Sequence, residues 1–195
     1  MKNSILLFIA ILAISTIASG QVDPNAIKKD IKKINKEESV LKKEKKEERK
    51  ELRKLNGMEV SYQAKQQFLT DYKMATDIKW ERTPYFDEAT FTKDGKTLKA
   101  YYDEQAKLVG TSAIVTFGDL PEKAQKYINK KYKDYTKGAV IFFDDNEFNE
   151  TDMLLYGLQF DDEDSYFVEL TKGTNKIVVR SNAAGDVYFF KELQK

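Results

Sequence analysis

Residues 99–109 read KAYYDEQAKLV, and residues 178–188 read VVRSNAAGDVY. In both stretches apolar and aromatic side chains stand on either side of a short polar segment, a pattern typical of two strands joined by a tight turn. Strands joined in this way are antiparallel neighbours in a sheet. Because the same pattern occurs twice, the sequence predicts an internal duplication.

Each stretch closes a longer run of elements that begins with an amphipathic helix. In the first half we expect a helix over 61–73, then strands over 77–83, 86–92, 97–103 and 108–117, with Asp94-Gly95 as a hairpin turn. In the second half Leu120-Pro121 begins a helix, and strands are expected over 137–144, 153–160, 165–171, 175–181 and 186–190. The predicted fold class is therefore α+β. A helix plus an antiparallel β-meander is repeated over about 60–117 and 118–191, within a domain of residues 58–195.

Spaced aromatic, glycine and turn residues link this pattern to a known family. They are Phe68, Trp80, Phe86, Phe91, Gly95, residues 100–103, Leu120-Pro121, Tyr132 and Gly185. The pattern covers nearly all of residues 60–190 and resembles the PepSY-like, beta-lactamase-inhibitor-like domains of secreted Gram-negative bacterial proteins. The resemblance implies a tandem helix-plus-antiparallel-sheet fold in the envelope, a protein-binding role and no catalytic residue. The sequence departs from the family at Ala106, where the family usually turns on glycine.

The first twenty residues have the three parts of a secretory signal peptide. Lys2 gives a positive start, residues 5–17 are apolar, and Ala18-Ser19-Gly20 forms a cleavage site. The apolar run is shorter than the roughly 20 residues that a spanning helix needs. No Cys follows it, so a lipid anchor is excluded. We expect a protein of the periplasm or the medium without a membrane span after cleavage; an uncleaved N-terminal anchor is the alternative.

The composition removes much of the chemistry that enzymes use. The chain has no Cys and no His, so Ser-His-Asp triads, Cys-His pairs and the usual zinc sites are all excluded. We therefore expect no catalytic residue, no resident metal and no cofactor, and we predict that the protein is not an enzyme.

A charged helical arm, residues 21–57, precedes the domain. It holds 13 Lys/Arg and 8 Asp/Glu, whereas residues 58–195 hold 19 and 24. Asp23-Pro24 and Asn56-Gly57 are start and stop signals for a helix of about 30 residues. Its apolar positions follow a heptad that charged side chains interrupt: Ile27, Ile31, Ile34, Leu41, Leu52 and Leu55, with Glu38, Lys45 and Glu48 between them.

Three interpretations of this arm stay open. The helix is largely solvated, or it forms a dimer or docks on a partner through residues 24–56, or it offers a basic surface. Lys and Glu are interspersed and the arm has no aromatic residue, which disfavours lipid and nucleic-acid binding. We expect no nucleic-acid partner.

Two acidic segments, residues 144–152 and 161–164, flank the strand expected at 153–160. Carboxylates and amides are calcium ligands, but the spacing departs from the EF-hand loop. A strand of eight residues would hold the segments roughly 25 Å apart at ~3.3 Å per residue. We therefore interpret them as solvated turns that cannot share one ion.

Apolar side chains also occur on the sheet face that we expect to lie opposite the helices. The candidate protein-binding residues are Trp80, Tyr101, Phe143, Leu155, Phe167 and Val178. An exposed apolar patch marks a docking site, whereas the arm or the sheet of the other half would cover it in the alternative. On strand 153–160 we expect Leu154, Tyr156, Leu158 and Phe160 to pack on a helix.

The sequence therefore predicts an exported, non-enzymatic envelope protein that binds another protein through its sheet face. Two alternatives remain: an inhibitor of a secreted hydrolase, such as a beta-lactamase or a peptidase, and a structural or assembly protein that acts through the arm.

Overall fold

A computed structural model describes residues 24–55, 57 and 59–193. The predicted signal peptide, residues 1–20, lies outside the described residues. The chain divides into two compact units, with the boundary between Glu48 and Arg49. Among the described helices, none combines the length and the apolar character that crossing a bilayer requires.

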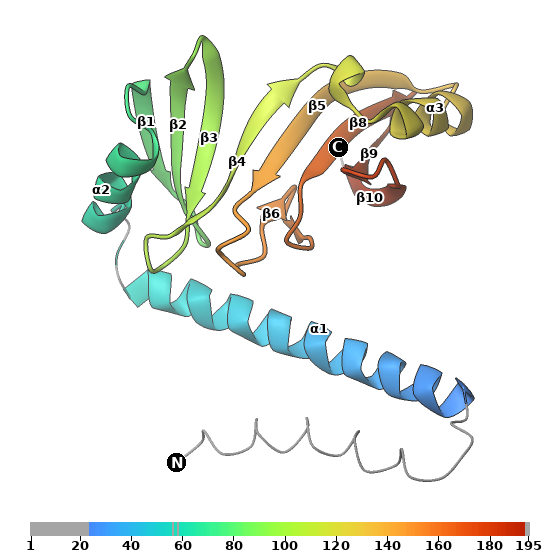
Figure 1. Ribbon diagram of the computed structural model, residues 1–195, viewed down its shortest axis with the longest axis horizontal. Helices are drawn as coiled ribbons and strands as arrows, with labels where there is room; N and C mark the ends of the chain where they lie inside the picture. Colours follow the sequence, from blue (N-terminus) through green and yellow to red (C-terminus); the bar gives the residue numbers. More distant parts are fainter. Residues whose placement is uncertain (1–23, 56, 58, 194–195) are drawn as a thin grey trace. The chain divides into compact units, whose positions relative to one another are not determined.

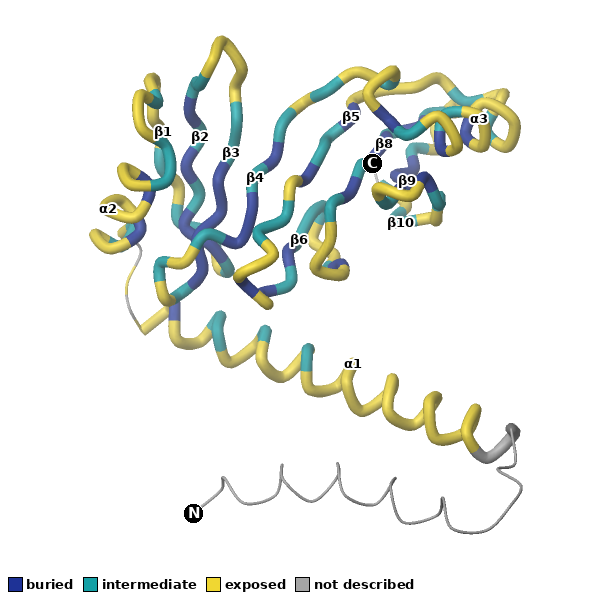
Figure 2. Tube along the Cα trace, in the orientation of Figure 1, coloured by how far each residue is buried: buried dark blue, intermediate teal, exposed yellow. Residues whose placement is uncertain are grey.

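The predicted arm helix is confirmed as α1 (Pro24–Leu55). Gly57 follows it with φ +85°, the left-handed conformation that ends helices and suits glycine. Up to Glu48 the side chains are mostly exposed (Figure 2). Pairs one turn apart, such as Lys33–Glu37 at 3.9 Å and Glu38–Lys42 at 3.7 Å, connect them. Such pairs each stabilise a helix by only about 0.2–0.5 kcal/mol.

The second unit is an eight-stranded antiparallel sheet in the order β1-β2-β3-β4-β5-β8-β9-β10 (Figure 1), which confirms the α+β class. The first helix, α2 (Tyr62–Asp71), precedes β1 (Thr76–Arg82), β2 (Asp87–Lys93), β3 (Lys96–Tyr102) and β4 (Leu108–Val115). The short helix η1 (Phe117–Asp119) and α3 (Glu122–Lys131) precede β5 (Thr136–Asp145), β8 (Ser165–Lys172), β9 (Asn175–Asn182) and β10 (Val187–Leu193). Each half is thus one helix followed by a four-stranded meander.

The turn between β3 and β4 and the turn between β9 and β10 have the same backbone hydrogen bonds. In the first, Asp103 donates its N–H to Lys107 at 3.0 Å and receives one from Ala106 at 3.1 Å. In the second, Asn182 donates to Asp186 at 3.2 Å and receives from Gly185 at 3.0 Å. Ala106 has φ +61° and Gly185 has φ +81°. An alanine therefore occupies a left-handed position that glycine occupies in the other half.

Both helices pack on the same face of the sheet. Side chains of α2, among them Ala64 and Phe68, lie against Phe91 and Tyr102 of the first half. Side chains of α3, Ala124 and Ile128, form the core of the second half with residues of β5, β8 and β9: Val140, Val168, Leu170, Ile177 and Val179. Phe167 of β8 belongs to a different cluster, on the face opposite the helices, as the sequence predicted.

The strand predicted over 153–160 is wrong. The segment is a small hairpin of β6 (Leu154–Leu155) and β7 (Leu158–Gln159), joined through Tyr156 and Gly157. These two residues have φ +52° and +75°, and two successive positive φ values are typical of a two-residue hairpin turn. The hairpin breaks the alternation of a single strand, and Phe160 packs on the face away from the helices.

Candidate functional site

The structure brings five of the six predicted binding residues together on the sheet face opposite the helices. Tyr101, Phe143, Phe167 and Val178 are buried members of one apolar cluster, and half-buried Leu155 packs against it. Trp80 lies apart on the helix side, where its ring is 5.4 Å from that of Phe68.

This cluster is covered by the segment between β5 and β8, residues 146–164. Its Met153 and Phe160 are buried in the cluster, and the Phe160 ring lies 5.3 Å from Phe143 and 4.9 Å from Phe167. Phe143 and Phe167 cannot touch a partner while this cover is in place. Partner binding through the six residues stays a prediction.

Beyond the cover, the same face of the sheet is open to solvent at β4. Ile114 is 72% exposed. It is paired across β4 and β5 with the half-buried Ile141, which is itself paired with buried Phe167. An apolar row therefore runs from the covered cluster to the surface and ends at Ile114.

The two acidic segments meet, and the expected separation of roughly 25 Å is wrong. Because β5 and β8 are neighbours, with Phe143 opposite Ser165, the ends of the intervening segment lie close together. The Asp145 N–H donates to Asp164 Oδ1 at 2.9 Å. Burial together with Asp162 and Asp164 raises the pKa of Asp145 to about 7. In the described part of the chain, no group of three or more acidic side chains is arranged to hold a metal ion.

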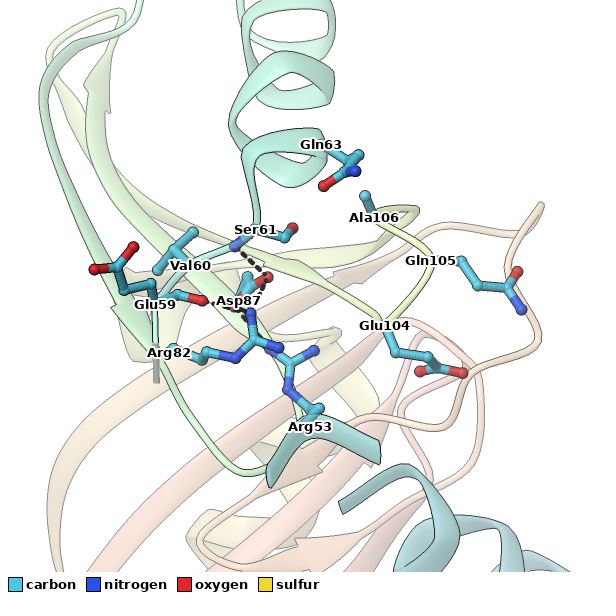
Figure 3. A pocket seen from close by; sticks show the side chains of 10 residues that line it. All are labelled: Arg53, Glu59, Val60, Ser61, Gln63, Arg82, Asp87, Glu104, Gln105 and Ala106. Atoms are coloured by element: carbon cyan, nitrogen blue, oxygen red, sulfur yellow. Dashed lines mark hydrogen bonds and ion pairs between the residues drawn. The ribbon is translucent and has the colours of Figure 1, made fainter. Parts of the chain in front are cut away.

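A hollow of about 620 Å³ lies between the last turns of α1, the start of α2 and the turn after β3 (Figure 3). All of its lining residues belong to the second unit: Arg53, Glu59, Val60, Ser61, Gln63, Arg82, Asp87, Glu104, Gln105 and Ala106.

Two arginines and one carboxylate form the floor of this hollow. Arg53 donates from Nη2 to Asp87 Oδ1 at 2.8 Å and from Nε to the Thr83 carbonyl at 3.2 Å. Arg82 Nη1 donates to the same Oδ1 at 3.3 Å, and the Ser61 N–H donates to Asp87 Oδ2 at 3.2 Å. Burial lowers the pKa of the Arg53 guanidinium, and Asp87 opposes that effect. The Arg53 side chain is only 2% exposed, so this ion pair is fixed inside the fold.

A second hollow of about 510 Å³ adjoins the first, since Gln63, Gln105 and Ala106 line both. Its far end is formed by the loop after β5, where Phe148 is 94% exposed. Polar and charged side chains make up most of the lining of both hollows, so the arrangement suits hydrogen bonding to a ligand.

Sequence reasoning missed Arg53, Phe148 and Ile114. Arg53 is one of many basic residues in the arm, and no local signal distinguishes the one that the fold buries. The buried Asp87 follows directly after the short loop between β1 and β2, and pairing the two would have required the tertiary structure.

No family model matches the chain, and no curated protein matches it. Solved structures do match. A DUF2874 family protein from Bacteroides uniformis has a TM-score of 0.57 at 14% identity, over 69% of this chain and 90% of its own. A BLIP-like protein from Bacteroides fragilis has a TM-score of 0.55 at 18% identity, over 71% and 89%.

A third match, described as a candidate periplasmic protein from Bacteroides eggerthii, has a TM-score of 0.57 at 13% identity, over 69% and 89% of the two chains. Identities this low support a shared fold and leave function open. The second unit of this chain therefore has the fold of the BLIP-like and DUF2874 proteins of Bacteroides.

Proposed function

We propose that this is an exported, non-enzymatic protein of the periplasm or the medium that binds another protein through its sheet face. The signal-peptide pattern, the absence of Cys and His and the likeness to a candidate periplasmic protein support this proposal. The repeated order of helix and meander supports an origin by internal duplication.

The observation that carries the binding role is Ile114, 72% exposed at the open end of an apolar row on the sheet. What distinguishes Ile114 from other exposed apolar residues is that it continues an apolar row on the sheet, and a contiguous apolar surface of this kind suits a protein interface. We expect the partner to pack on Ile114 and Ile141, next to the cover.

The test is capture from envelope extract of the source bacterium with residues 21–195, read by quantitative mass spectrometry. Ile114→Lys should abolish recovery of the partner, whereas Leu69→Lys, at an exposed apolar position on α2, should not. Equal recovery by Ile114→Lys and the unchanged chain would exclude the open sheet face as the binding surface.

A second candidate function is inhibition of a secreted hydrolase, which the likeness to a BLIP-like protein favours. The purified chain would be titrated against beta-lactamases and envelope peptidases, and inhibition at micromolar concentration is the expected result. Full activity of every enzyme in the panel at that concentration would contradict it.

A third candidate is assembly through the arm, favoured by the exposed apolar residues of α1. Ile27, Ile31 and Ile34 are 46%, 50% and 56% exposed. If the arm forms a dimer, sedimentation of residues 21–195 should show a dimer that Ile31→Lys converts to a monomer. A monomer before and after the substitution would remove this candidate.

A further inference from the structure

Lysines are concentrated on α3 and in the turn that follows it. Residues 122–137 hold six lysines and two acidic residues, whereas residues 58–195 as a whole hold 19 basic and 24 acidic residues. All six of these lysines are exposed. A strongly basic surface therefore lies within a part of the chain whose net charge is negative.

Acidic neighbours neutralise only the first two of these lysines. Lys123 Nζ lies 2.6 Å from Asp186 Oδ1, and Lys126 Nζ lies 2.6 Å from Glu122 Oε1. The other four have no ion-pair partner in the described part of the chain: Lys130, Lys131, Lys133 and Lys137.

Tyrosine rings accompany the four unpaired lysines. Lys131 Nζ lies 2.8 Å from Tyr127 Oη, and 5.2 Å and 5.6 Å from the centroids of the Tyr127 and Tyr132 rings. The Tyr132 and Tyr135 rings are 5.5 Å apart, and Lys172 of β8 lies 5.8 Å from the Tyr135 ring. These contacts join the helix end to the sheet in one lysine–tyrosine surface, whose members are Tyr127, Lys130, Lys131, Tyr132, Lys133, Tyr135, Lys137 and Lys172.

The fold itself does not require this excess of positive charge. The helix α2 packs in the same way on the sheet of the first half, and residues 62–73 hold only two lysines and one acidic residue. Lysines offset the dipole at the C-terminal end of a helix, which accounts for Lys130 and Lys131 in the last turn of α3. Lys133 and Lys137 lie beyond the helix, so the charge at this end calls for an anionic partner.

We propose that the lysine–tyrosine surface binds the anionic headgroups of a phospholipid bilayer. Each lysine close to an anionic membrane surface strengthens binding by a factor of about five. Tyrosine is enriched at the boundary between membrane and water because its ring is apolar and its hydroxyl is polar. The arm helix, in contrast, has no aromatic residue.

The acidic segments give the bound protein an orientation. Lys137 lies near the start of β5 (Thr136–Asp145) and Lys172 ends β8 (Ser165–Lys172), whereas residues 144–152 and 161–164 lie at the other ends of these two strands. An anionic surface attracts the first ends and repels the second. The second unit should therefore rest on a bilayer with its acidic segments turned away.

The spread of the charges favours a bilayer over a single bound phosphate. The lysines belong to the end of a helix, the turn after it and two strands, and α3 lines neither of the two hollows. A sheet of headgroups can meet all of them at once. That an exported protein meets such a surface rests on the proposed function, but the sheet-face surface at Ile114 plays no part in this inference.

The test is flotation of residues 21–195 with phosphatidylcholine vesicles that contain or lack phosphatidylglycerol. We expect binding to the anionic vesicles alone. Binding should be lost as salt shortens the Debye length from about 10 Å at 0.1 M to about 3 Å at 1 M. Lys130→Gln combined with Lys133→Gln should weaken binding at least ~tenfold. Lys65→Gln combined with Lys73→Gln removes the same charge from exposed positions on and after α2 and should leave binding nearly unchanged.

The basic arm is the competing membrane site, and another variant separates the two. Lys28→Gln combined with Lys32→Gln lowers the net charge equally at exposed positions of α1 and should leave vesicle binding nearly unchanged. Ile114→Lys should not weaken vesicle binding, so failure of this proposal and failure of the sheet-face proposal appear in different variants. Urea midpoints check that every variant is folded.

Three results would overturn the proposal. The first is no binding to anionic vesicles at low salt. The second is an equal loss of binding for the substitutions on α3, α2 and the arm, which would assign the attraction to net charge. The third is a low-salt dimer that the α3 substitutions dissociate while vesicles stay unbound, which would assign the surface to the acidic segments of a second copy.

Discussion

At the scale of single residues, Ala106 is strained where its counterpart in the second half is not. Its φ of +61° lies in a region that costs an L-residue with a side chain roughly 1 kcal/mol. Ala106→Gly should therefore raise the free energy of unfolding by about 0.5–1 kcal/mol, measured by urea denaturation.

The reciprocal change at Gly185 should do the opposite. A Cβ there would lie 2.9 Å from Lys123 Cβ and 3.2 Å from the Ala124 nitrogen, so α3 would have to shift. Gly185→Ala should destabilise the protein by about 1–3 kcal/mol. Equal effects of both substitutions, in sign and size, would contradict this account of the two turns.

Asp87 is the acceptor on which Arg53, Arg82 and the Ser61 N–H converge. Removing its charge takes away the carboxylate that two guanidinium groups share, and their side chains are only 2% and 8% exposed. Asp87→Asn should cost about 3–5 kcal/mol in urea denaturation. The matched control is Glu51→Gln, which breaks the exposed Glu51–Lys54 pair and should change stability little. A small loss for Asp87→Asn would show that the buried pair stabilises the fold weakly.

Asp145 should make stability depend on pH. Its pKa is raised from 3.8 to about 7 in the folded protein, so between these values the folded state holds a proton that the unfolded state has lost. Its contribution therefore falls as the pH rises from about 4 through about 7. Urea midpoints at pH 5 and pH 8 should differ in that direction, and Asp145→Asn should reduce the difference. An unchanged difference would assign the effect to other groups.

The candidate site could be predicted from the sequence only in part, and single residues show why. Alternation placed Phe143, Phe167 and Val178 on one face, and they do lie together. What covers that face depends on the fold of residues 146–164, which alternation did not reveal. Arg53 and Glu104 are far apart in sequence and carry no motif, so only their positions in space identify them.

At the scale of elements, the small hairpin of β6 and β7 is part of the segment, residues 146–164, that covers the apolar cluster. Phe160 is 5% exposed and Phe148 is 94% exposed, although both belong to the same connection. Phe160→Ala should cost about 3–5 kcal/mol, whereas Phe148→Ala should cost almost nothing. Thermal and urea denaturation of the two variants compare the same substitution at a buried position and at an exposed one. A similar cost for both would mean that the cover is not fixed on the sheet.

Helices and hairpins with strong local signals were predicted well, and the element without one was not. Asp94-Gly95 has φ +52° and +74°, as the turn preference of these residues requires. Tyr156-Gly157 forms the same kind of turn, but a bulky tyrosine rarely adopts positive φ. The apolar run around it therefore gave the pattern of one continuous strand.

At the scale of the whole molecule, the two units should differ in local stability. Residues 24–48 form one helix with largely exposed side chains, and helix propensity with pairs one turn apart gives marginal protection. The backbone amides of the buried strands β8 and β9 should exchange only when the whole second unit unfolds. Hydrogen exchange should therefore be orders of magnitude faster in residues 24–48 than in these strands. Comparable protection would show that the arm is packed against something in solution.

The position of Trp80 determines what an optical unfolding experiment can detect. The chain has one tryptophan, and it packs in the first half, with its ring 5.4 Å from Phe68 and 6.0 Å from Tyr102. Its emission therefore reports solvent entry around α2 and is blind to the α3 half. If the halves separate during denaturation, fluorescence and circular dichroism will give different midpoints.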